Sequence, residues 1–281
     1  MKREGVIGYP LSHSLSPTIF QAAFDAAGFE ARYEKWPTPP EDIEPRMASL
    51  REDDVFGGNV TIPHKEAVIP HLDRLDPLAE RIGAVNTIVN EGGRLAGYNT
   101  DVPGFARSLR EDAAFDARGC RAVVLGAGGA ARAIVVALIE HGAARIDVVG
   151  RTTARVEKLV SDLDAQAGST ALAAGDEASL READLIVNCT PLGTRGSAGE
   201  GQSPIEARQI PRDAVVFDLV YNPPDTPLVL AARDAGARGA SGLGMLVYQA
   251  AESFRLWTGD DAPAAVMFEA GRAALGVGVA R

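Results

Sequence analysis

Short apolar runs alternate with longer segments of helical periodicity along most of this 281-residue chain. In the N-terminal part, this alternation is typical of a mostly parallel sheet with helices between its strands. The elements that it predicts there are strands at 5–8, 31–35 and 56–60, and helices that begin at Pro17, span 41–52 and run to about His71. Residues 82–98 predict a hairpin, whose two strands are joined by the turn Gly92-Gly93.

The alternation becomes regular from about Gly119 onward, which predicts a doubly wound, Rossmann-like unit. Its predicted elements are strands at 122–125, 145–149, 170–173, 185–188 and 215–219, and helices at 130–141, 152–167 and 177–183. A helix at 104–114 would connect this unit to the N-terminal part. Three more helices are predicted at 227–235, 242–259 and 262–275. The second of these carries an apolar stripe that belongs to a core, at Leu246, Ala250, Phe254 and Trp257.

A glycine turn joins the first strand of the regular unit to its first helix. Gly126, Gly128 and Ala131 fit the pattern G-x-G-x-x-G/A in a strand–turn–helix context. The first glycine permits the tight turn, the second lets a pyrophosphate approach the backbone, and free N–H groups at the helix start bind phosphate. The alternative is an ordinary tight turn between a strand and a helix. We favour a dinucleotide site, with the cofactor bound by Gly126, Ala127, Gly128, Gly129 and Ala130.

The residues after the second strand of this unit predict which dinucleotide binds. NAD sites carry an Asp or Glu at this strand end, which accepts a hydrogen bond from the ribose 2′-OH. Here Gly150 is followed by Arg151 and Thr152, and Arg155 lies one helical turn further on. Two guanidinium groups and a hydroxyl suit a 2′-phosphate, which a carboxylate would repel. A merely basic helix start is less favourable, because the helix dipole disfavours cations there. The sequence therefore predicts NADP as the cofactor.

Polar residues gather where the N-terminal strands end, which is where open α/β sheets bind ligands. Lys65 follows the strand at 56–60, Asp101 follows the hairpin, and Ser14 and Ser16 precede the first helix. Each has a structural alternative, because a serine or aspartate can cap a helix and a lysine is usually a solvated surface charge. The residues alone leave both explanations open.

The composition narrows the classes of function. Hydrophobic residues make up 46% of the chain and charged residues 23%, as in ordinary globular proteins. The net charge of −10 argues against nucleic acid or a membrane surface as a partner, because both are anionic. Cys120 and Cys189 lie in or beside apolar runs, which predicts reduced core thiols. Because no signal-like or transmembrane apolar segment is evident, we expect a cytoplasmic protein.

Seven motifs in order span nearly the whole chain and closely resemble those of the shikimate dehydrogenase family. They are Ser14-x-Ser16, Asn59-Val-Thr-Ile-Pro-His-Lys65, Gly83-Ala-Val-Asn-Thr87, Asn99-Thr-Asp101, Gly126-Ala-Gly-Gly-Ala130, Tyr221-Asn-Pro223, and Gly242-Leu-Gly-Met-Leu246 with Gln249. The resemblance implies NADPH-dependent reduction of 3-dehydroshikimate to shikimate, a step towards the aromatic amino acids.

The resemblance also implies that the chain has two α/β domains and that its last helices return to the first of them. The substrate domain would comprise residues 1–102 and 240–281, and the Rossmann-like NADP domain residues 103–239. We expect a small-molecule substrate, no metal, and either a monomer or a homodimer.

Roles for single residues follow from the same resemblance. Lys65 and Asp101 would be the catalytic pair, because a ketone that receives hydride becomes an alkoxide and needs a proton donor nearby. The substrate carboxylate would be bound by Ser14, Ser16 and Tyr221, and the ring hydroxyls by Thr61, Asn86 and Gln249. Beside the glycine turn, the predicted cofactor residues are Arg151, Thr152, Arg155, Thr190 and Gly242.

Three positions depart from the family pattern. Gly150 stands where many members carry Asn, Thr194 where Met is common, and Tyr248 where His or Ala often precedes Gln249. A quinate or aminoshikimate dehydrogenase is the near alternative, although Ser16 rather than Thr favours shikimate. A dinucleotide sensor without catalysis is the more distant alternative, and it would be expected to lack the acid/base pair.

Overall fold

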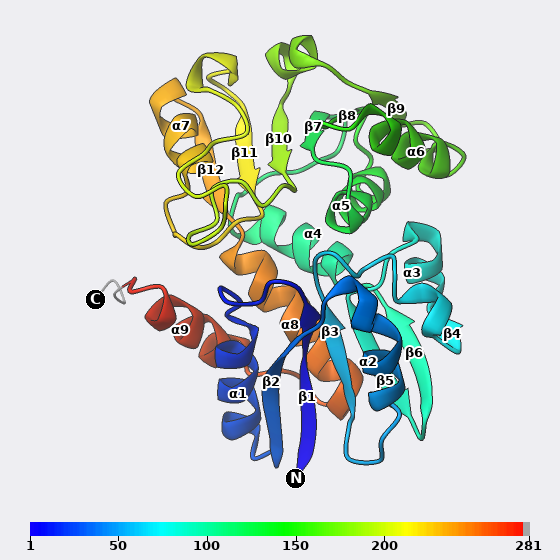
Figure 1. Ribbon diagram of the computed structural model, residues 1–281. Coiled ribbons are helices and arrows are strands. Elements are labelled where there is room, and N and C mark those ends of the chain that lie inside the picture. Colours follow the sequence, from blue (N-terminus) through cyan, green and yellow to red (C-terminus); the bar gives the residue numbers. More distant parts are fainter. Residues whose placement is uncertain (278–281) are drawn as a thin grey trace. The chain divides into compact units, whose positions relative to one another are not determined.

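The chain folds into two compact units in a computed structural model that describes residues 1–277 (Figure 1). Unit 1 comprises Met1–Gly104 and Leu246–Arg281, and unit 2 comprises Phe105–Met245. The sequence places the first boundary between residues 102 and 103 and the second between 239 and 240. The chain passes from one unit to the other within two helices, α4 (Asp101–Glu111) and α8 (Leu243–Thr258).

Unit 1 is built on a mixed sheet whose strand order is β2-β1-β3-β5-β6-β4. The strands are β1 (Lys2–Gly8), β2 (Ala31–Pro37), β3 (Gly57–Val60), β4 (Arg74–Leu75), β5 (Thr87–Glu91) and β6 (Arg94–Tyr98). The first three run parallel to one another, whereas β5 is antiparallel to both β3 and β6. The predicted hairpin is confirmed, since β5 and β6 are joined at Gly92 and Gly93, both at positive φ.

Helices cover both faces of this sheet. They are α1 (Ser16–Ala27), α2 (Ile43–Ser49), α3 (Pro77–Ile82), α8 and α9 (Ala264–Ala274), with 3₁₀ turns at Pro40–Asp42 and Ile69–His71. Met47 of α2 and Ala79 of α3 pack with Ile7 of β1 on one face. On the other, Tyr33 of β2 stacks on Phe20 of α1 at a centroid distance of 4.4 Å, and Phe20 also contacts Trp257 of α8.

Two expectations about helices in unit 1 were wrong. The predicted helix up to His71 is only a short turn, because Pro70 lacks the N–H that a longer helix would use. Helix α3 was not predicted, although its termini carry clear signals. The Asp76 side chain accepts a hydrogen bond from the N–H of Leu78, Pro77 is the first helical residue, and Gly83 ends the helix at φ 69°.

Unit 2 is a parallel sheet of strand order β12-β11-β10-β7-β8-β9, which confirms the Rossmann-like expectation. Its strands are β7 (Arg121–Leu125), β8 (Arg145–Val149), β9 (Ala171–Ala174), β10 (Leu185–Asn188), β11 (Val215–Asp218) and β12 (Arg238–Ser241). The helices are α5 (Gly129–Glu140), α6 (Thr153–Asp164) and α7 (Pro227–Ala235), with 3₁₀ segments at Glu177–Glu182 and Ala207–Gln209. Strand β12 was missed, because Arg238, Gly239 and Ser241 give no apolar run.

Both cysteines lie in unit 2 and are free. Cys120 is buried, as expected, and burial raises the pKa of its thiol to about 12. Cys189 is only partly buried, since it follows β10 at the strand end. Within residues 1–277, no helix has the length and apolar character needed to cross a membrane.

Strand β1 begins earlier than the apolar run predicts and carries a carboxyl group into the interior of unit 1. Glu4 has no solvent exposure, and neither of its carboxylate oxygens has a hydrogen-bond partner among the described residues. Burial raises the pKa of this carboxyl to about 8, against a smaller opposing effect of Lys2. The fold therefore favours the protonated, neutral form of Glu4.

We predict that Glu4→Gln makes the protein more stable than the wild type at alkaline pH. The pKa of Glu4 rises from 4.5 to about 8 on folding, so its contribution is present at low pH and is lost as the pH rises through about 8. Between pH 6 and pH 9 the loss should be about 2–3 kcal/mol, because the loss begins at pH 4.5 and is partly complete at pH 6. Urea unfolding at pH 6 and pH 9 measures it. Glu30→Gln, at an exposed position of the same unit, is the control; an equal pH dependence in wild type and Glu4→Gln would contradict the prediction.

Candidate active site

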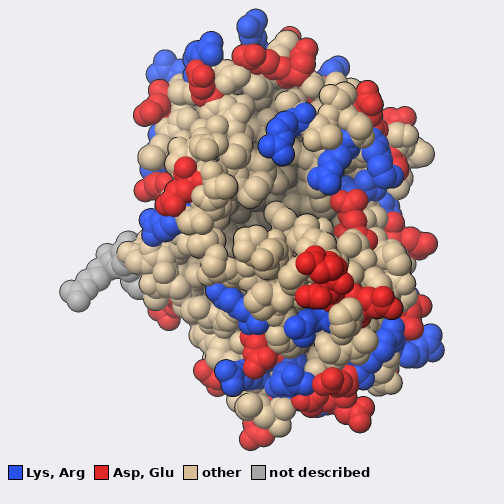
Figure 2. All heavy atoms as spheres, in the orientation of Figure 1, with Lys and Arg blue, Asp and Glu red and all other residues tan. Residues whose placement is uncertain are grey.

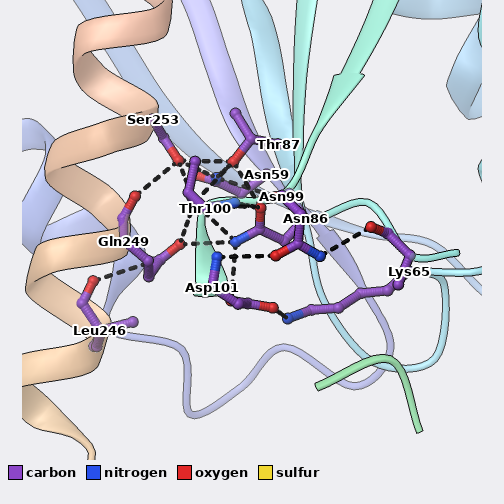
Figure 3. Close-up of polar contacts among 11 residues, drawn as sticks. Asn59, Lys65, Asn86, Thr87, Asn99, Thr100, Asp101, Leu246, Gln249 and Ser253 are labelled. Carbon is purple, nitrogen blue, oxygen red and sulfur yellow. Dashed lines mark hydrogen bonds and ion pairs between the residues drawn. The ribbon is translucent and has the colours of Figure 1, made fainter. Parts of the chain in front are cut away.

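An ion pair between Lys65 and Asp101 lies at one edge of a network of polar residues in unit 1 (Figure 3). Lys65 is in the turn that follows β3, and Asp101 is the first residue of α4. The Lys65 Nζ donates a hydrogen bond to Asp101 Oδ2, and the two side chains are only 13% and 6% exposed. The lysine is therefore a buried, directed ammonium and not a solvated surface charge.

Asp101 begins its helix and does not precede it as a cap. Helix α4 starts three residues earlier than predicted, because Pro103 is tolerated in a first turn whose N–H groups have no helical partner. The Asp101 N–H donates to Asn99 Oδ1 at 3.0 Å, and its Oδ1 accepts from Asn86 Nδ2 at 2.9 Å. One carboxylate oxygen thus faces an amide and the other faces the ammonium.

The side-chain amide of Asn86, just before β5, forms hydrogen bonds to residues at the start of α4 and in α8. Its Oδ1 accepts from the backbone N–H of Thr100 at 2.7 Å. Its Nδ2 lies 2.9 Å from Thr100 Oγ1, 2.9 Å from Asp101 Oδ1 and 3.3 Å from Gln249 Oε1. Because an amide nitrogen carries two hydrogens, these three acceptors share two donors. Asn86 is 2% exposed, so its orientation is set by the protein.

Helix α8 brings Gln249 to this network. The Gln249 Nε2 donates to the carbonyl of Leu246 at 2.8 Å, which turns its Oε1 towards Asn86. The close approach of α4 and α8 depends on Gly104, because a Cβ there would lie 2.8 Å from the backbone nitrogen of Gln249. Only a residue without a side chain allows this contact.

A second layer of polar side chains lies behind Asn86, and sequence reasoning missed its roles. Asn59 Nδ2 donates to Thr87 Oγ1 at 3.1 Å and to Ser253 Oγ at 3.0 Å, and these two hydroxyls are 2.7 Å apart. The Tyr33 hydroxyl donates to Asn59 Oδ1 at 2.7 Å, and burial raises the pKa of this phenol well above its usual value. Asn59 and Thr87 stand within the quoted motifs, whereas no sequence signal identifies Ser253.

The remaining predicted residues of unit 1 lie outside the Asn86 network. Ser14 Oγ accepts from the backbone N–H of Ser16 at 3.3 Å, a bond within the turn before α1, whose N-cap position is Leu15 and has no side-chain cap. Ser16 is 8% exposed and Thr61 is partly buried at the end of β3. His64, quoted in the same motif, is 1% exposed with its Nε2 2.6 Å from the carbonyl of Thr38, which gives it a structural task.

In unit 2, the glycine turn has the geometry that a phosphate site requires. Gly126 has φ 112°, which disfavours any other residue, whereas a Cβ on Gly128 would meet no protein atom within 4 Å. Gly128 precedes α5, and no side chain caps that helix. Ala131 is fully buried at the start of α5. Free N–H groups and an open approach therefore coincide at the end of the helix that attracts anions.

Arg151, Thr152 and Arg155 are exposed at the start of α6. Within residues 1–277 neither guanidinium has an ion pair or a hydrogen bond to a side chain, and Figure 2 shows basic side chains gathered over the part of unit 2 that carries α5 and α6. Gly150 leaves room for α6, because a Cβ there would lie 2.9 Å from Val156 Cγ2. This packing accounts for the first departure from the family pattern.

The other predicted residues of unit 2 lie at the ends of β10, β11 and β12. Thr190 is partly buried after β10, and Tyr221 is partly buried in the turn after β11. Gly242 permits a close backbone contact, because a Cβ there would lie 2.2 Å from the carbonyl oxygen of Leu219. Thr194 has no contact that assigns it a role.

The remaining departure, Tyr248, lies in the part of α8 that belongs to unit 1. Its ring meets that of Phe268 of α9 edge to face at a centroid distance of 5.2 Å. Packing between these two helices therefore explains the aromatic residue at this position.

This chain combines a Rossmann-like unit, which has an uncapped glycine turn, with an α/β unit that holds a buried lysine–carboxylate pair. The combination defines the class of dinucleotide-dependent oxidoreductases. Comparison with known proteins makes this class more specific. Residues 6–88 match the family model of the shikimate dehydrogenase substrate binding domain, residues 108–225 that of shikimate / quinate 5-dehydrogenase, and residues 242–270 that of the shikimate 5'-dehydrogenase C-terminal domain.

Individual relatives agree with these matches. The shikimate dehydrogenase (NADP(+)) of Methanopyrus kandleri is 47% identical over 271 residues, which cover 95% of this chain and 93% of the relative. The crystal structure of shikimate 5-dehydrogenase from Thermus thermophilus in complex with NADP(H) and shikimate has a TM-score of 0.88 at 40% identity and covers 98% of this chain and 100% of that one. Quinate dehydrogenase from Corynebacterium glutamicum in complex with NAD gives 0.85 at 31%, over 96% and 98%. The chain belongs to the shikimate dehydrogenase family.

Proposed function

We propose that this protein catalyses the NADP-dependent, reversible reduction of 3-dehydroshikimate to shikimate. The observation that carries the proposal is the buried Lys65–Asp101 pair, in which an ammonium is held in one direction by a carboxylate. A sensor without catalysis has no need of such a pair, and burying two charges is costly unless they are paired and hydrogen-bonded. All the predicted substrate residues except Tyr221 lie in unit 1, and all the predicted cofactor residues lie in unit 2.

Lys65 acts as the proton donor in the direction of reduction. NADPH, when bound, supplies the hydride that attacks the ketone carbon. The carbonyl oxygen then gains a negative charge, and Lys65 Nζ transfers a proton to it, so that an alcohol and a neutral amine result. In the direction of oxidation the neutral amine takes the proton back. Asp101, oriented by Asn86 and Asn99, directs the ammonium throughout.

Polar side chains of unit 1 would bind the rest of the substrate. Asn86 and Gln249 are held by one another, and together with Thr61 they would bind ring hydroxyls. The Ser14 hydroxyl accepts a backbone N–H and keeps its own hydrogen, which it can donate to the substrate carboxylate. We assign Ser16 and Tyr221 to the same carboxylate.

The cofactor would be held by the glycine turn and by the start of α6. Gly126, Gly128 and the uncapped α5 present backbone N–H groups to the pyrophosphate. Arg151, Thr152 and Arg155 would bind the 2′-phosphate, and Thr190 and Gly242 would lie beside the remainder of the dinucleotide. The donor set fits an anionic ligand, because the arginines have no carboxylate of their own in the part of the chain that the structure describes.

Oxidation of quinate is the second candidate, since a quinate dehydrogenase is among the similar structures. The basic start of α6 and the absence of an acidic residue at 150–152 favour NADP, and thus the shikimate reaction.

We predict that Lys65→Ala lowers kcat by a factor on the order of 10²–10⁴, the usual contribution of a general acid, and changes the KM for shikimate much less. The ammonium acts mainly on the charge that develops on oxygen during the reaction. Steady-state kinetics of shikimate oxidation measure both parameters. Lys2→Ala, at a partly exposed lysine of the same unit that donates to the carbonyl of Asp53, is the control. Unchanged turnover in Lys65→Ala would remove Lys65 from the mechanism.

We predict that Arg151→Ala weakens the binding of NADPH by about 1–3 kcal/mol, the range for a hydrogen bond to a charged group, and leaves NADH binding nearly unchanged. The reason is that only NADPH carries the 2′-phosphate. Fluorescence titration of both cofactors gives the two dissociation constants. Arg208→Ala removes an exposed arginine of the same unit that pairs with Glu206, so it controls for net charge. Equal loss for NADPH and NADH would show that Arg151 has a structural role instead.

The substrate assignment predicts the highest kcat/KM for shikimate with NADP⁺ in a panel of shikimate and quinate, each with NADP⁺ and NAD⁺. The pair Arg151 and Arg155 should favour the phosphorylated cofactor with either substrate. A higher kcat/KM for quinate with NAD⁺ would replace the proposed reaction by that of a quinate dehydrogenase.

A further inference from the structure

A buried carboxylate lies at the carboxyl end of β11, outside every role assigned so far. Asp218 is the last residue of this strand and has no solvent exposure. Its Oδ1 accepts from Asn188 Nδ2 at 2.8 Å and from the backbone N–H of Val220 at 3.0 Å. Its Oδ2 accepts from the Thr226 hydroxyl at 2.6 Å. All these donors are neutral, so the carboxylate is held without a cation.

Keeping this group in the interior is unfavourable. Burial raises the pKa of Asp218 to about 6, and the hydrogen bonds from Thr226, Val220 and Asn188 oppose that rise only in part. An apolar residue would avoid the desolvation of a charge. The role of Asp218 therefore follows from the groups that it orients.

Asp218 determines which way the amide of Asn188 points. An ionised carboxylate can only accept hydrogen bonds, so Asn188 must turn its NH₂ group towards Asp218 and its oxygen away from it. That oxygen accepts from the N–H of Thr190 at 2.9 Å and from the Thr190 hydroxyl at 2.7 Å. If the amide were reversed, its NH₂ group would face the N–H of Thr190 and that bond would be lost, and the Thr190 hydroxyl would have to turn from donor to acceptor.

Thr190, in turn, lies against the glycine turn. A Cβ on Gly126 would lie 3.3 Å from Thr190 Cγ2 and 3.4 Å from the carbonyl carbon and oxygen of Cys189. The position of Thr190 therefore decides how much space remains beside the first glycine of the turn.

The same carboxylate also holds the turn after β11. Through the N–H of Val220 it fixes the backbone just before Tyr221, and the carbonyl of Val220 accepts from the N–H of Gly242 at 3.2 Å. Thr226, which donates to Asp218, also accepts from the N–H of Val229 and so caps α7. Asp218 thus connects the ends of β10, β11 and β12, where Thr190 and Gly242 lie.

We propose that Asp218 is a positioning residue of the cofactor site, which acts by setting the orientation of Asn188 and, through it, the position of Thr190 beside Gly126. This inference rests on the proposed function, because only there do Thr190 and Gly126 contact a dinucleotide. It adds to that function two residues, Asp218 and Asn188, that do not touch the cofactor themselves.

The test uses Asp218→Asn, Thr190→Val and the double variant in the full-length protein, with NADPH binding measured by fluorescence titration without a second substrate. Asp218→Asn should raise the Kd for NADPH by about 5–10-fold, as expected for the loss of one oriented hydrogen-bond network. In the double variant the Kd should equal that of Thr190→Val within about twofold, because both changes act on one chain of contacts. The KM for NADP⁺ should rise more than the KM for shikimate, because Asp218 reaches Tyr221 only through the backbone of Val220.

Asp147→Asn is the matched control, because Asp147 is a buried aspartate of the same sheet that pairs with Arg145 and reaches no predicted cofactor residue among those that the structure describes. It should leave the Kd for NADPH unchanged. An unchanged Kd for NADPH in Asp218→Asn would overturn the proposal. So would a fold-increase in Kd of the double variant that equals the product of the two single fold-increases.

If Asp218→Asn does not fold, Thr226→Val replaces it as the test and Thr226→Ser as its control. The valine removes the donor to Asp218 Oδ2 and should raise the Kd about 2–3-fold, whereas the serine keeps the hydroxyl and should not. Equal Kd values for these two variants would overturn the proposal.

Failure of the proposed function gives a different result. If the wild-type protein binds NADPH but does not oxidise shikimate, only the substrate assignment is wrong. If the wild-type protein does not bind NADPH, both the cofactor assignment and this inference are wrong.

Discussion

The amide of Asn86 is the constraint on which the active-site arrangement of unit 1 depends. It is buried, so each of its hydrogen-bonding groups needs a partner, and the partners come from the start of α4 and from α8. These partners leave one orientation for the amide, and that orientation directs Asp101 Oδ2 towards Lys65. The direction of the Lys65–Asp101 ion pair is thus fixed by hydrogen bonds whose donors and acceptors cannot be exchanged.

Unit 2 uses the same physical device at its own strand ends. There the carboxylate of Asp218 selects the orientation of the Asn188 amide, and the amide oxygen fixes Thr190. In both units a carboxylate, which can only accept hydrogen bonds, fixes which side of a buried amide carries the NH₂ group and which carries the oxygen. The difference lies in the third group, since a cation faces Asp101 whereas only neutral donors face Asp218.

Sequence reasoning succeeded where the signals are local. Helix α7 was predicted at its observed bounds, and the structure shows clear local signals at both ends: Thr226 caps it, Pro227 begins it and Gly236 ends it. The helix predicted up to His71 is absent, because Pro70 has no N–H to donate within a longer helix. In the site, Lys65 and Asp101 could be named from motifs, but the link between Thr87 and Ser253 joins positions 166 residues apart and exists only once α8 packs on the sheet. The cost of burying Glu4 was likewise invisible, because its strand was predicted to begin after it.

The acidity of the chain makes the unpaired arginines at the start of α6 more significant. A net charge of −10 repels an anionic dinucleotide at long range, so attraction has to come from a few groups at short range. Arginines such as Arg145 and Arg132 cannot serve, because they already face Asp147 and Asp162 and a ligand would have to displace a carboxylate. Arg151 and Arg155 are exposed and have no such competitor in the described part of the chain. Their charge can therefore be neutralised by a phosphate at no loss of an existing ion pair, which is a physical reason for discrimination between NADP and NAD.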